Sequence, residues 1–218
     1  MSNAPLPTAI LPIVDADWLA NLPSATRQTL QPDAVARLLH ELAIPMVQLR
    51  AKGDAESARP FLETWLKALR HQAPDTRIIL NDRLAWVAPL QADGVHVGQG
   101  DTPAATCRRE LGRHRIIGLS THTLAEIRQA EALGVDYIGF GPIFPTTTKR
   151  DTHAVQGVDT LTRMVEATAL PLVAIGGITL ENLAEVAATG AQGAALISAL
   201  WQTDWERRLR IAVETWRR

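Results

Sequence analysis

The chain has 218 residues, of which 46% are hydrophobic and 21% charged, and its formal net charge is -1 at pH 7. This is an ordinary globular composition, and its near-neutral charge gives no reason to expect nucleic acid or an anionic membrane as a partner. No apolar run approaches the roughly 20 residues of a membrane-spanning helix. Residues 1–7 are predicted to be a flexible tail, and they lack a signal-peptide core. The single cysteine, Cys107, excludes an internal disulfide framework. We therefore expect a cytoplasmic protein.

Short β-branched runs alternate with helical patterns along the whole chain. The first strand is predicted at residues 13–15, directly after Pro12, because proline is awkward inside a strand. Continuous apolar runs such as RIIL and PLVAI are typical of strands that are buried on both faces. Seven further strands are predicted, at residues 45–50, 77–81, 94–97, 115–120, 136–140, 171–175 and 193–198.

Helix signals lie between these strands. Thr123 and Glu126 form a capping box before the segment LAEIRQAEAL. A helix is predicted from Thr179, with Gly190 as its stop. The last helix starts near Asp204 and carries one apolar stripe, made of Trp205, Leu209, Ala212 and Trp216.

Eight strands, each followed by a helix and without a linker between them, predict a single parallel α/β domain over residues 1–218. An open doubly wound sheet would give the same alternation, but the count of eight favours a (β/α)8 TIM barrel. Active sites of such barrels lie at the C-terminal ends of the strands. Nearly every predicted strand ends on a polar residue or a glycine: Asp15, Arg50, Lys52, Asn81, Asp82, His96, Ser120, Gly141, Gly176, Gly177 and Ser198.

The connection from Gly141 to Gly157, GPIFPTTTKRDTHAVQG, is unusually long for a structureless segment in a compact domain. Three consecutive threonines are followed at once by Lys149 and Arg150. Hydroxyl groups beside cations suit phosphate oxygens. The alternative is a solvated loop whose threonines cap turns, and this segment alone leaves both interpretations open.

The segment QLRAK places Gln48, Arg50 and Lys52 two residues apart, so that an extended chain points them the same way and Leu49 the other way. Three polar groups facing the barrel interior would be costly without an anionic partner. The alternative is that the strand ends at Arg50 and its charges are solvated. We favour anion binding.

Two carboxylates follow neighbouring strands, Asp82 after one and Asp101 after the next. One or two carboxylates, completed by water and phosphate oxygens, are typical of a magnesium–diphosphate site. The alternative is that each aspartate caps the helix that follows it. The spacing supports both interpretations equally.

Glycines and histidines at the strand ends also carry signals. Gly176 and Gly177 after the seventh strand, with Ile197 and Ser198 at the eighth, suit a backbone phosphate cradle. A paired glycine can also be a plain turn, but its position after PLVAI favours the cradle. We assign no catalytic role to His96 or His122, because a lone histidine in a barrel layer is typically a hydrogen-bonded structural residue.

Taken together, these segments resemble the thiamine phosphate synthase family. The resemblance covers nearly the whole chain in order, through QLRAK, ILNDR, ADGVHVGQGD, IIGLSTHT, DYIGFGPIFPTTTK, VAIGGI and ALIS. The family fold is a (β/α)8 barrel. The resemblance implies a transferase that condenses 4-amino-2-methyl-5-hydroxymethylpyrimidine diphosphate with 4-methyl-5-(2-phosphoethyl)thiazole, by a dissociative, carbocation-type displacement, into thiamine phosphate and diphosphate.

The resemblance also implies the residues that bind each group. The pyrimidine diphosphate would be held by Gln48, Leu49, Arg50, Ala51, Lys52 and Asn81. Mg²⁺ would be the cofactor, bound by Asp82 and Asp101. The thiazole phosphate would be held by Thr146, Thr147, Thr148, Gly177, Ile197 and Ser198. Ser120 and Lys149 would contact the pyrimidine substrate and its diphosphate, and catalysis would depend on Arg50, Lys52, Lys149 and Ser120.

One position departs from the family pattern. Ala51 stands where many relatives have a glutamate between the two cations, so any ion-pair support for Arg50 must come from elsewhere. Two alternative functions remain, a thiazole tautomerase-like barrel enzyme and a non-catalytic barrel that binds thiazole phosphate. A tautomerase would have no use for the carboxylates and the paired cations, although it could use His122 as an acid or base.

Overall fold

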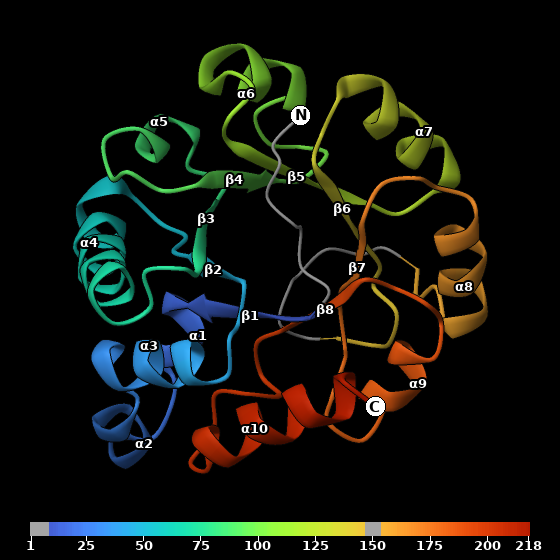
Figure 1. Ribbon diagram of the computed structural model, residues 1–218. Coiled ribbons are helices and arrows are strands. Elements are labelled where there is room, and N and C mark those ends of the chain that lie inside the picture. Colours follow the sequence, from blue (N-terminus) through green and yellow to red (C-terminus); the bar gives the residue numbers. More distant parts are fainter. Residues whose placement is uncertain (1–8, 147–153) are drawn as a thin grey trace.

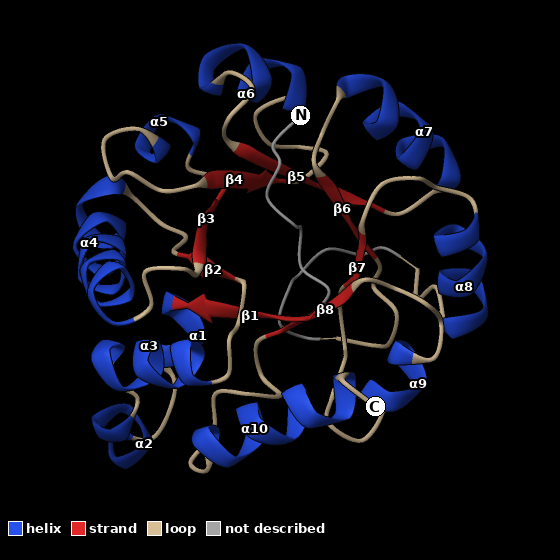
Figure 2. Cartoon of the chain, viewed as in Figure 1, coloured by secondary structure: helices blue, strands red, loops and turns tan. Residues whose placement is uncertain are grey.

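A computed structural model describes residues 9–146 and 154–218. In these parts of the chain eight parallel strands form a closed barrel in chain order, and the last strand pairs with the first. The helices surround the ring of strands on its outside (Figures 1 and 2). This closure confirms the predicted (β/α)8 TIM barrel and excludes an open sheet. The predicted tail at residues 1–7 lies outside the described residues.

Strands and helices alternate almost throughout. The strands are β1 (Ala9–Asp15), β2 (Met46–Arg50), β3 (Arg77–Asn81), β4 (Gly94–Val97), β5 (Ile116–Thr121), β6 (Tyr137–Phe140), β7 (Leu172–Ala174) and β8 (Gly193–Leu196). The helices are α1 (Ala16–Ala20), α2 (Ser24–Thr29), α3 (Pro32–Glu41), α4 (Ala55–Gln72), α5 (Leu84–Val87), α6 (Ala104–Leu111), α7 (Leu124–Leu133), α8 (Val158–Glu166), α9 (Leu183–Ala187) and α10 (Trp205–Trp216). None of the helices in the described ranges is long and apolar enough to cross a membrane.

Strand β1 begins earlier than predicted and contains Pro12. Residues up to Pro12 are in register with β8, and the pairing with β2 starts at Ile13. Pro12 therefore lies where the pairing passes from one neighbouring strand to the other. A residue without an amide hydrogen is less disruptive at such a point than in the middle of a ladder. The other seven strands lie within two residues of their predicted bounds.

Two apolar clusters follow from the alternation of side chains along the strands. The larger cluster fills the layer between the strands and the helices. The smaller one lies inside the barrel and consists of Leu11, Ile13, Met46, Ile79, Ile116, Tyr137, Val173 and Ala195. Gly118 in β5 makes room for two interior rings, because a Cβ atom there would lie 2.4 Å from His96 Nδ1 and 2.3 Å from the Tyr137 ring.

The helix signals were confirmed to different degrees. Helix α7 has the predicted cap, in which Thr123 Oγ1 accepts a hydrogen bond of 3.2 Å from the Glu126 amide. Helix α10 buries the predicted stripe apart from Trp216, which is half-buried. Helix α9 begins later than predicted, because Asn182 Oδ1 accepts the Thr179 amide (2.8 Å) and holds the preceding residues in a turn.

Candidate active site

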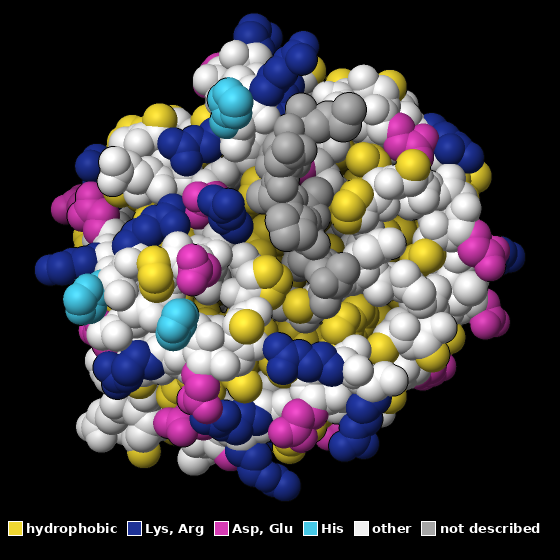
Figure 3. All heavy atoms as spheres, in the orientation of Figure 1, with side chains coloured by type: hydrophobic (Ala, Val, Ile, Leu, Met, Phe, Trp, Pro, Cys, Tyr) yellow, Lys and Arg dark blue, Asp and Glu magenta, His cyan; other side chains and the backbone are white. Residues whose placement is uncertain are grey.

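A cavity of about 800 Å³ lies inside the barrel and opens at the C-terminal ends of the strands. Apolar interior residues, among them Leu11, Ile13 and Val173, line part of it, and polar residues from the strand ends line the rest. Hydrophobic side chains are visible at the centre of the face shown in Figure 3, and charged side chains lie around them. The cavity is large enough for two small substrates.

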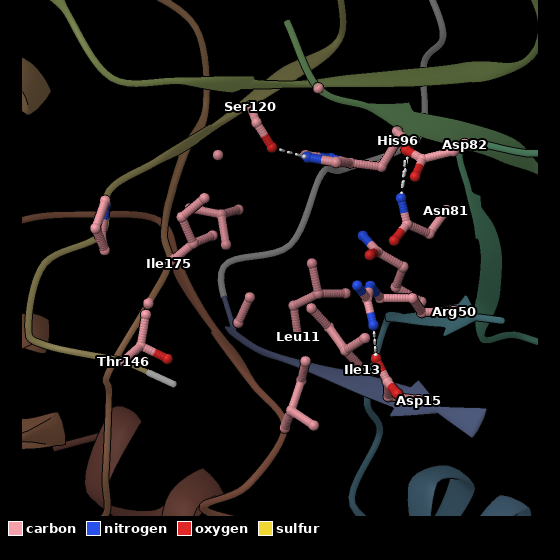
Figure 4. Close-up of a pocket in the computed structure, with 18 of the residues that line it drawn as sticks. Leu11, Ile13, Asp15, Arg50, Asn81, Asp82, His96, Ser120, Thr146 and Ile175 are labelled. Carbon is pink, nitrogen blue, oxygen red and sulfur yellow. Dashed lines mark hydrogen bonds and ion pairs between the residues drawn. The ribbon is translucent and has the colours of Figure 1, made fainter. Parts of the chain in front are cut away.

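Arg50, at the end of β2, contributes a cation to one wall of the cavity. Its guanidinium Nη1 donates to Asp15 Oδ2 in a buried ion pair (Figure 4). Asp15 and Arg50 are register partners on β1 and β2, which places their side chains next to each other. The ion-pair support that Ala51 cannot supply therefore comes from Asp15.

The other residues of QLRAK divide as the alternation predicts. Gln48 and Lys52 line the cavity with Arg50. Leu49 and Ala51 are only 0% and 3% exposed and pack in the layer outside the strands. Their side chains do not line the cavity, so any contact that they make with a ligand is through the backbone.

The Asp82 carboxylate lies beside these cations. Lys52 Nζ forms an ion pair with Asp82 Oδ2, and Asn81 Nδ2 donates to Asp82 Oδ1 at 2.5 Å. Burial raises the pKa of the Asp82 carboxyl above its ordinary value. Lys52 opposes that rise in pKa, whereas a hydrogen bond with Asp101 adds to it. The two carboxylates that the sequence predicted to be neighbours are therefore close together.

Neither of these carboxylates caps a helix. Helix α5 starts after Arg83 and helix α6 after Pro103, and neither helix has a side-chain cap. Asp101 Oδ2 instead accepts the Gly98 amide at 2.8 Å. The helix-capping alternative for both aspartates is therefore wrong.

The donor set at this wall fits a magnesium ion. Within the described ranges there is no cluster of three or more histidine, cysteine or acidic side chains that could enclose a metal ion. Mg²⁺ seldom needs such a cluster, because it commonly binds through one or two carboxylates together with water and substrate phosphates. Asp82 and Asp101 supply two carboxylates, which lie close enough together to interact directly.

A hydrogen-bonded chain crosses the barrel interior to Ser120. Gln48 hydrogen-bonds to Tyr137, whose hydroxyl lies 2.9 Å from His96 Nδ1, and His96 Nε2 lies 2.9 Å from Ser120 Oγ. Burial holds the pKa of Tyr137 far above its usual range, so the phenol stays protonated. With Gln48 donating to the phenol oxygen, the phenol proton goes to His96 Nδ1 and the imidazole donates through Nε2 to Ser120. His96 is thus a hydrogen-bonded interior residue, as predicted.

The predicted phosphate-binding residues that the structure describes also line the cavity. Thr146 lies across the cavity from Arg50, Asn81 and Asp82 (Figure 4). Gly177 lies against the backbone of Phe144 and Pro145, close to Thr146, and Ile197 and Ser198 line the cavity after β8. Thr147, Thr148 and Lys149 lie outside the described residues.

The described parts of the connection from Gly141 to Gly157 contain no helix or strand, as predicted, and backbone hydrogen bonds attach them to the turn after β7 and to each other. The Ile143 and Phe144 amides donate to the carbonyl oxygens of Ile175 and Gly176 at 3.0 and 3.1 Å. The Gly157 amide donates to the Ile143 oxygen at 3.1 Å, which joins the two ends. His122 Nδ1 donates to the Gly141 oxygen at 2.6 Å.

Sequence reasoning missed several polar residues of the cavity. Asp15 was noted as a polar strand end but given no role, and Tyr137 carries no signal that separates it from a core aromatic residue. Gln99 donates to the Ser120 backbone oxygen at 2.7 Å, and Trp18 lines the rim of the cavity. The segment VGQGD contains Gln99 but gives no indication of that contact.

Comparisons with known proteins identify the family of this chain. The family model described as thiamine monophosphate synthase matches residues 22–200. The chain is 41% identical to the thiamine-phosphate synthase of Vibrio campbellii over 173 residues, which cover 78% of this chain and 83% of that protein. It is also 41% identical to the enzyme of the same name from Bacillus mycoides over 191 residues, covering 85% and 87%. The chain belongs to the thiamine monophosphate synthase family.

A solved structure of a member of the thiamine monophosphate synthase family extends the match to the fold. Thiamine phosphate pyrophosphorylase from Pyrococcus furiosus is 30% identical, with a TM-score of 0.75 over 95% of this chain and 96% of that one. The family resemblance that the seven segments indicate is therefore confirmed.

Proposed function

We propose that this protein condenses the pyrimidine diphosphate with the thiazole phosphate into thiamine phosphate and diphosphate, as a magnesium-dependent, alkyl- or aryl-type transferase. The observation that carries the proposal is the two-sided cavity. Cations and paired carboxylates form one wall, Thr146 and Gly177 lie on the other, and apolar side chains lie between them. Family membership supports the same reaction.

The first requirement of this reaction is a stable leaving group. The bond from the exocyclic carbon to the diphosphate oxygen breaks, and the electron pair leaves with the diphosphate. Arg50 and Lys52 lie where they can donate charge-assisted hydrogen bonds to the departing oxygens. Mg²⁺, held by Asp82 and Asp101, would add positive charge at the same group.

The second requirement is that the carbocation survives until the thiazole attacks it. The thiazole nitrogen donates its lone pair to the cationic carbon and forms the new C–N bond. The apolar interior of the cavity keeps water from this carbon. Ser120, held by His96, would contact the pyrimidine. No protein nucleophile is needed.

Binding of the thiazole phosphate would fall to the opposite wall. We propose that Gly177, Ile197 and Ser198 form a backbone cradle there, and that the threonines from Thr146 to Thr148 complete it. Gly177 has a φ of +68° and no side chain, so a phosphate can approach its backbone closely.

One assay separates this proposal from its rivals. Both substrates are incubated with and without MgCl₂, and thiamine phosphate and diphosphate are measured. We expect both products only with Mg²⁺. A thiazole tautomerase-like enzyme would isomerise its thiazole without releasing diphosphate, and a non-catalytic binding barrel would bind thiazole phosphate without turnover. Either result would refute the synthase proposal.

Lys149 provides a second test. We propose that its ammonium group approaches the diphosphate, so Lys149→Ala should lower kcat more than it raises the KM for thiazole phosphate. Steady-state kinetics with each substrate varied in turn measure both effects. A variant with an unchanged kcat and a raised thiazole KM would assign Lys149 to the thiazole phosphate instead.

We propose that the protein is located in the cytoplasm. Its one cysteine, Cys107, is buried and unpaired, which agrees with a reducing compartment.

A further inference from the structure

We propose that Asp15 is a positioning residue, which fixes the Arg50 guanidinium in the orientation that receives the diphosphate. This inference rests on the proposed function, because it assigns the diphosphate to the wall that contains Arg50. It also identifies the carboxylate that supports Arg50, since Ala51 cannot supply one.

The barrel places Asp15 and Arg50 together as a buried pair. Asp15 and Arg50 end adjacent strands as register partners, and both line the cavity. The Asp15 side chain is 2% exposed and the Arg50 side chain 12%. A carboxylate at this depth is costly unless a cation accompanies it. Asp15 and Arg50 therefore stabilise each other's charge in one defined geometry.

Asp15 is itself held in place. Its Oδ1 accepts the Trp18 amide at 2.9 Å, which caps helix α1, while Oδ2 accepts from Arg50. Trp18 Nε1 donates to the Trp201 oxygen at 3.2 Å, and Trp201 Nε1 donates to the Ile13 oxygen at 2.6 Å. The carboxylate is thus fixed by the start of α1, and α1 is fixed to the segment after β8.

The Asp15 carboxylate in turn restricts the orientation of Arg50. A guanidinium is planar, so anchoring Nη1 to a fixed carboxylate sets the direction of the remaining donors. Arg50 Nε is buried, and it has no hydrogen-bond partner in the part of the chain that the structure describes. A buried donor without a partner is costly. A diphosphate oxygen in the cavity would supply one.

Position 51 cannot provide this support in the present packing. Ala51 is 3% exposed and belongs to the apolar layer between the strands and the helices. Its Cβ therefore faces the outer layer, whereas Asp15 lies beside Arg50 in Figure 4. The orientation of Arg50 depends on β1 rather than on its own loop.

Two variants test the role of Asp15 without removing the cap of α1. Asp15→Asn and Asp15→Ser both keep an oxygen that can accept the Trp18 amide, and both remove the charge. We expect the KM for the pyrimidine diphosphate to rise by about tenfold to a hundredfold, the range for one lost hydrogen bond to a charged group. The KM for thiazole phosphate should change by less than about twofold, because its wall is untouched.

A matched control separates positioning from stability. Asp136 resembles Asp15, since it pairs with Arg108 at 2.6 Å and also accepts the Ile117 amide at 2.8 Å, but it does not line the cavity. Asp136→Asn should lower Tm and leave both KM values unchanged. A similar KM change in this variant would make the Asp15 effect a general loss of stability and overturn the proposal.

The decisive measurement is a double-mutant cycle with Arg50→Gln. Calorimetry gives the affinity for inorganic diphosphate in MgCl₂ for the wild type, both single variants and Asp15→Asn/Arg50→Gln. If Asp15 acts through Arg50, Asp15→Asn weakens binding in the wild-type background and has no further effect in Arg50→Gln. Equal weakening in both backgrounds, or none in either, would overturn the proposal. Absence of turnover in the wild type would refute the proposed function instead, and this binding cycle would still give its own result.

Discussion

Asp82 has a left-handed backbone, with a φ of +60°, and its carboxylate lies next to both Lys52 and Asp101. Among residues other than glycine, asparagine and aspartate adopt this conformation most readily. Asp82→Asn therefore keeps the backbone preference and removes only the charge. Asp82→Ala adds backbone strain of about 1–2 kcal/mol. The asparagine variant is the cleaner probe of the proposed metal site.

We expect Asp82→Asn to abolish magnesium-dependent turnover while the protein stays folded, because a neutral amide is a much weaker ligand for Mg²⁺ than a carboxylate. Turnover is measured over a range of MgCl₂ concentrations, and circular dichroism checks the fold. Full activity in this variant would show that Asp82 is not a metal ligand.

The same variant has an expected effect on stability that depends on pH. Because the folded-state pKa of Asp82 is raised above 3.8, the folded protein binds this proton more tightly than the unfolded chain does. The stabilising effect of that proton is lost as the pH rises through the folded pKa. The ionised carboxylate therefore lowers the free energy of unfolding at pH 7, and Asp82→Asn should be the more stable protein there.

Urea denaturation in EDTA, at several pH values from 7 down to about 4, measures this difference. The advantage of Asp82→Asn should shrink as the pH falls, because the wild type then regains the proton. A variant that is less stable than the wild type at pH 7 would show that the attraction of Lys52 outweighs the burial of the carboxylate.

His96 links Tyr137 to Ser120 inside the barrel. His96→Ala would leave two buried hydroxyls without this partner, and we expect it to lower the free energy of unfolding by about 2–4 kcal/mol. It should also lower kcat, because Ser120 loses the group that orients it. If both residues act on one step, Ser120→Ala and His96→Ala together should reduce kcat by less than the product of their separate effects. Multiplicative effects would mean that His96 does not act on kcat through Ser120.

At the scale of elements, local signals in the sequence predicted most of the fold. The Thr123 cap of α7, the apolar stripe of α10 and the buried strands all depend on neighbouring residues, and all were confirmed. The start of β1 and the start of α9 were wrong. The first depends on how β1 shares its pairing between β8 and β2, and the second on the side-chain bond from Asn182.

The candidate site divides in the same way. Polar residues at strand ends were identified as cavity residues, because a barrel brings those ends together. The proximity of Asp82 and Asp101 was predicted, but the other contacts were not, since Asp15 pairs with Arg50 from 35 residues away and His96 meets Tyr137 across 41 residues. The first pair depends on the register of β1 and β2 and the second on the registers of β5 with both β4 and β6, which a single sequence does not give.

The turn after β7 supports both the loop from Gly141 and the proposed phosphate cradle. A Cβ at Gly177 would lie 2.5 Å from the Phe144 oxygen and 2.6 Å from the Pro145 oxygen. Gly177→Ala should therefore displace the loop backbone, lower the free energy of unfolding by about 2–4 kcal/mol and raise the KM for thiazole phosphate.

Gly134 provides the matched control for this prediction. Its φ of +66° is nearly the same as that of Gly177, but a Cβ there would meet nothing within 4 Å. Gly134→Ala should cost only the backbone strain, about 1–2 kcal/mol, and leave the KM unchanged. If urea denaturation gave equal losses for the two variants, the contact with the loop would contribute nothing beyond that strain.

At the scale of the whole molecule, barrel closure brings the two walls of the cavity together. The charged wall comes from β1 to β4 and the segments after them, whereas Thr146, Gly177 and Ser198 follow β6, β7 and β8. Pairing between β1 and β8 joins the two halves directly. A change that breaks the pairing between β1 and β8 should therefore reduce kcat even if each wall still binds its own ligand. The two reacting atoms would no longer be held together.

Binding at the charged wall should be visible in the stability of the whole chain. A ligand that binds only the folded state at a hundred times its Kd stabilises it by about 2.7 kcal/mol. For a chain of this size we expect inorganic diphosphate with MgCl₂ to raise Tm by about 5–10 °C. Asp101→Asn should lose the part of this shift that requires Mg²⁺, whereas Asp136→Asn, which starts from a lower Tm, should show the full shift. Differential scanning calorimetry with diphosphate in MgCl₂ or in EDTA measures both parts, and an equal shift with and without Mg²⁺ would mean that the cations bind the diphosphate without a metal ion.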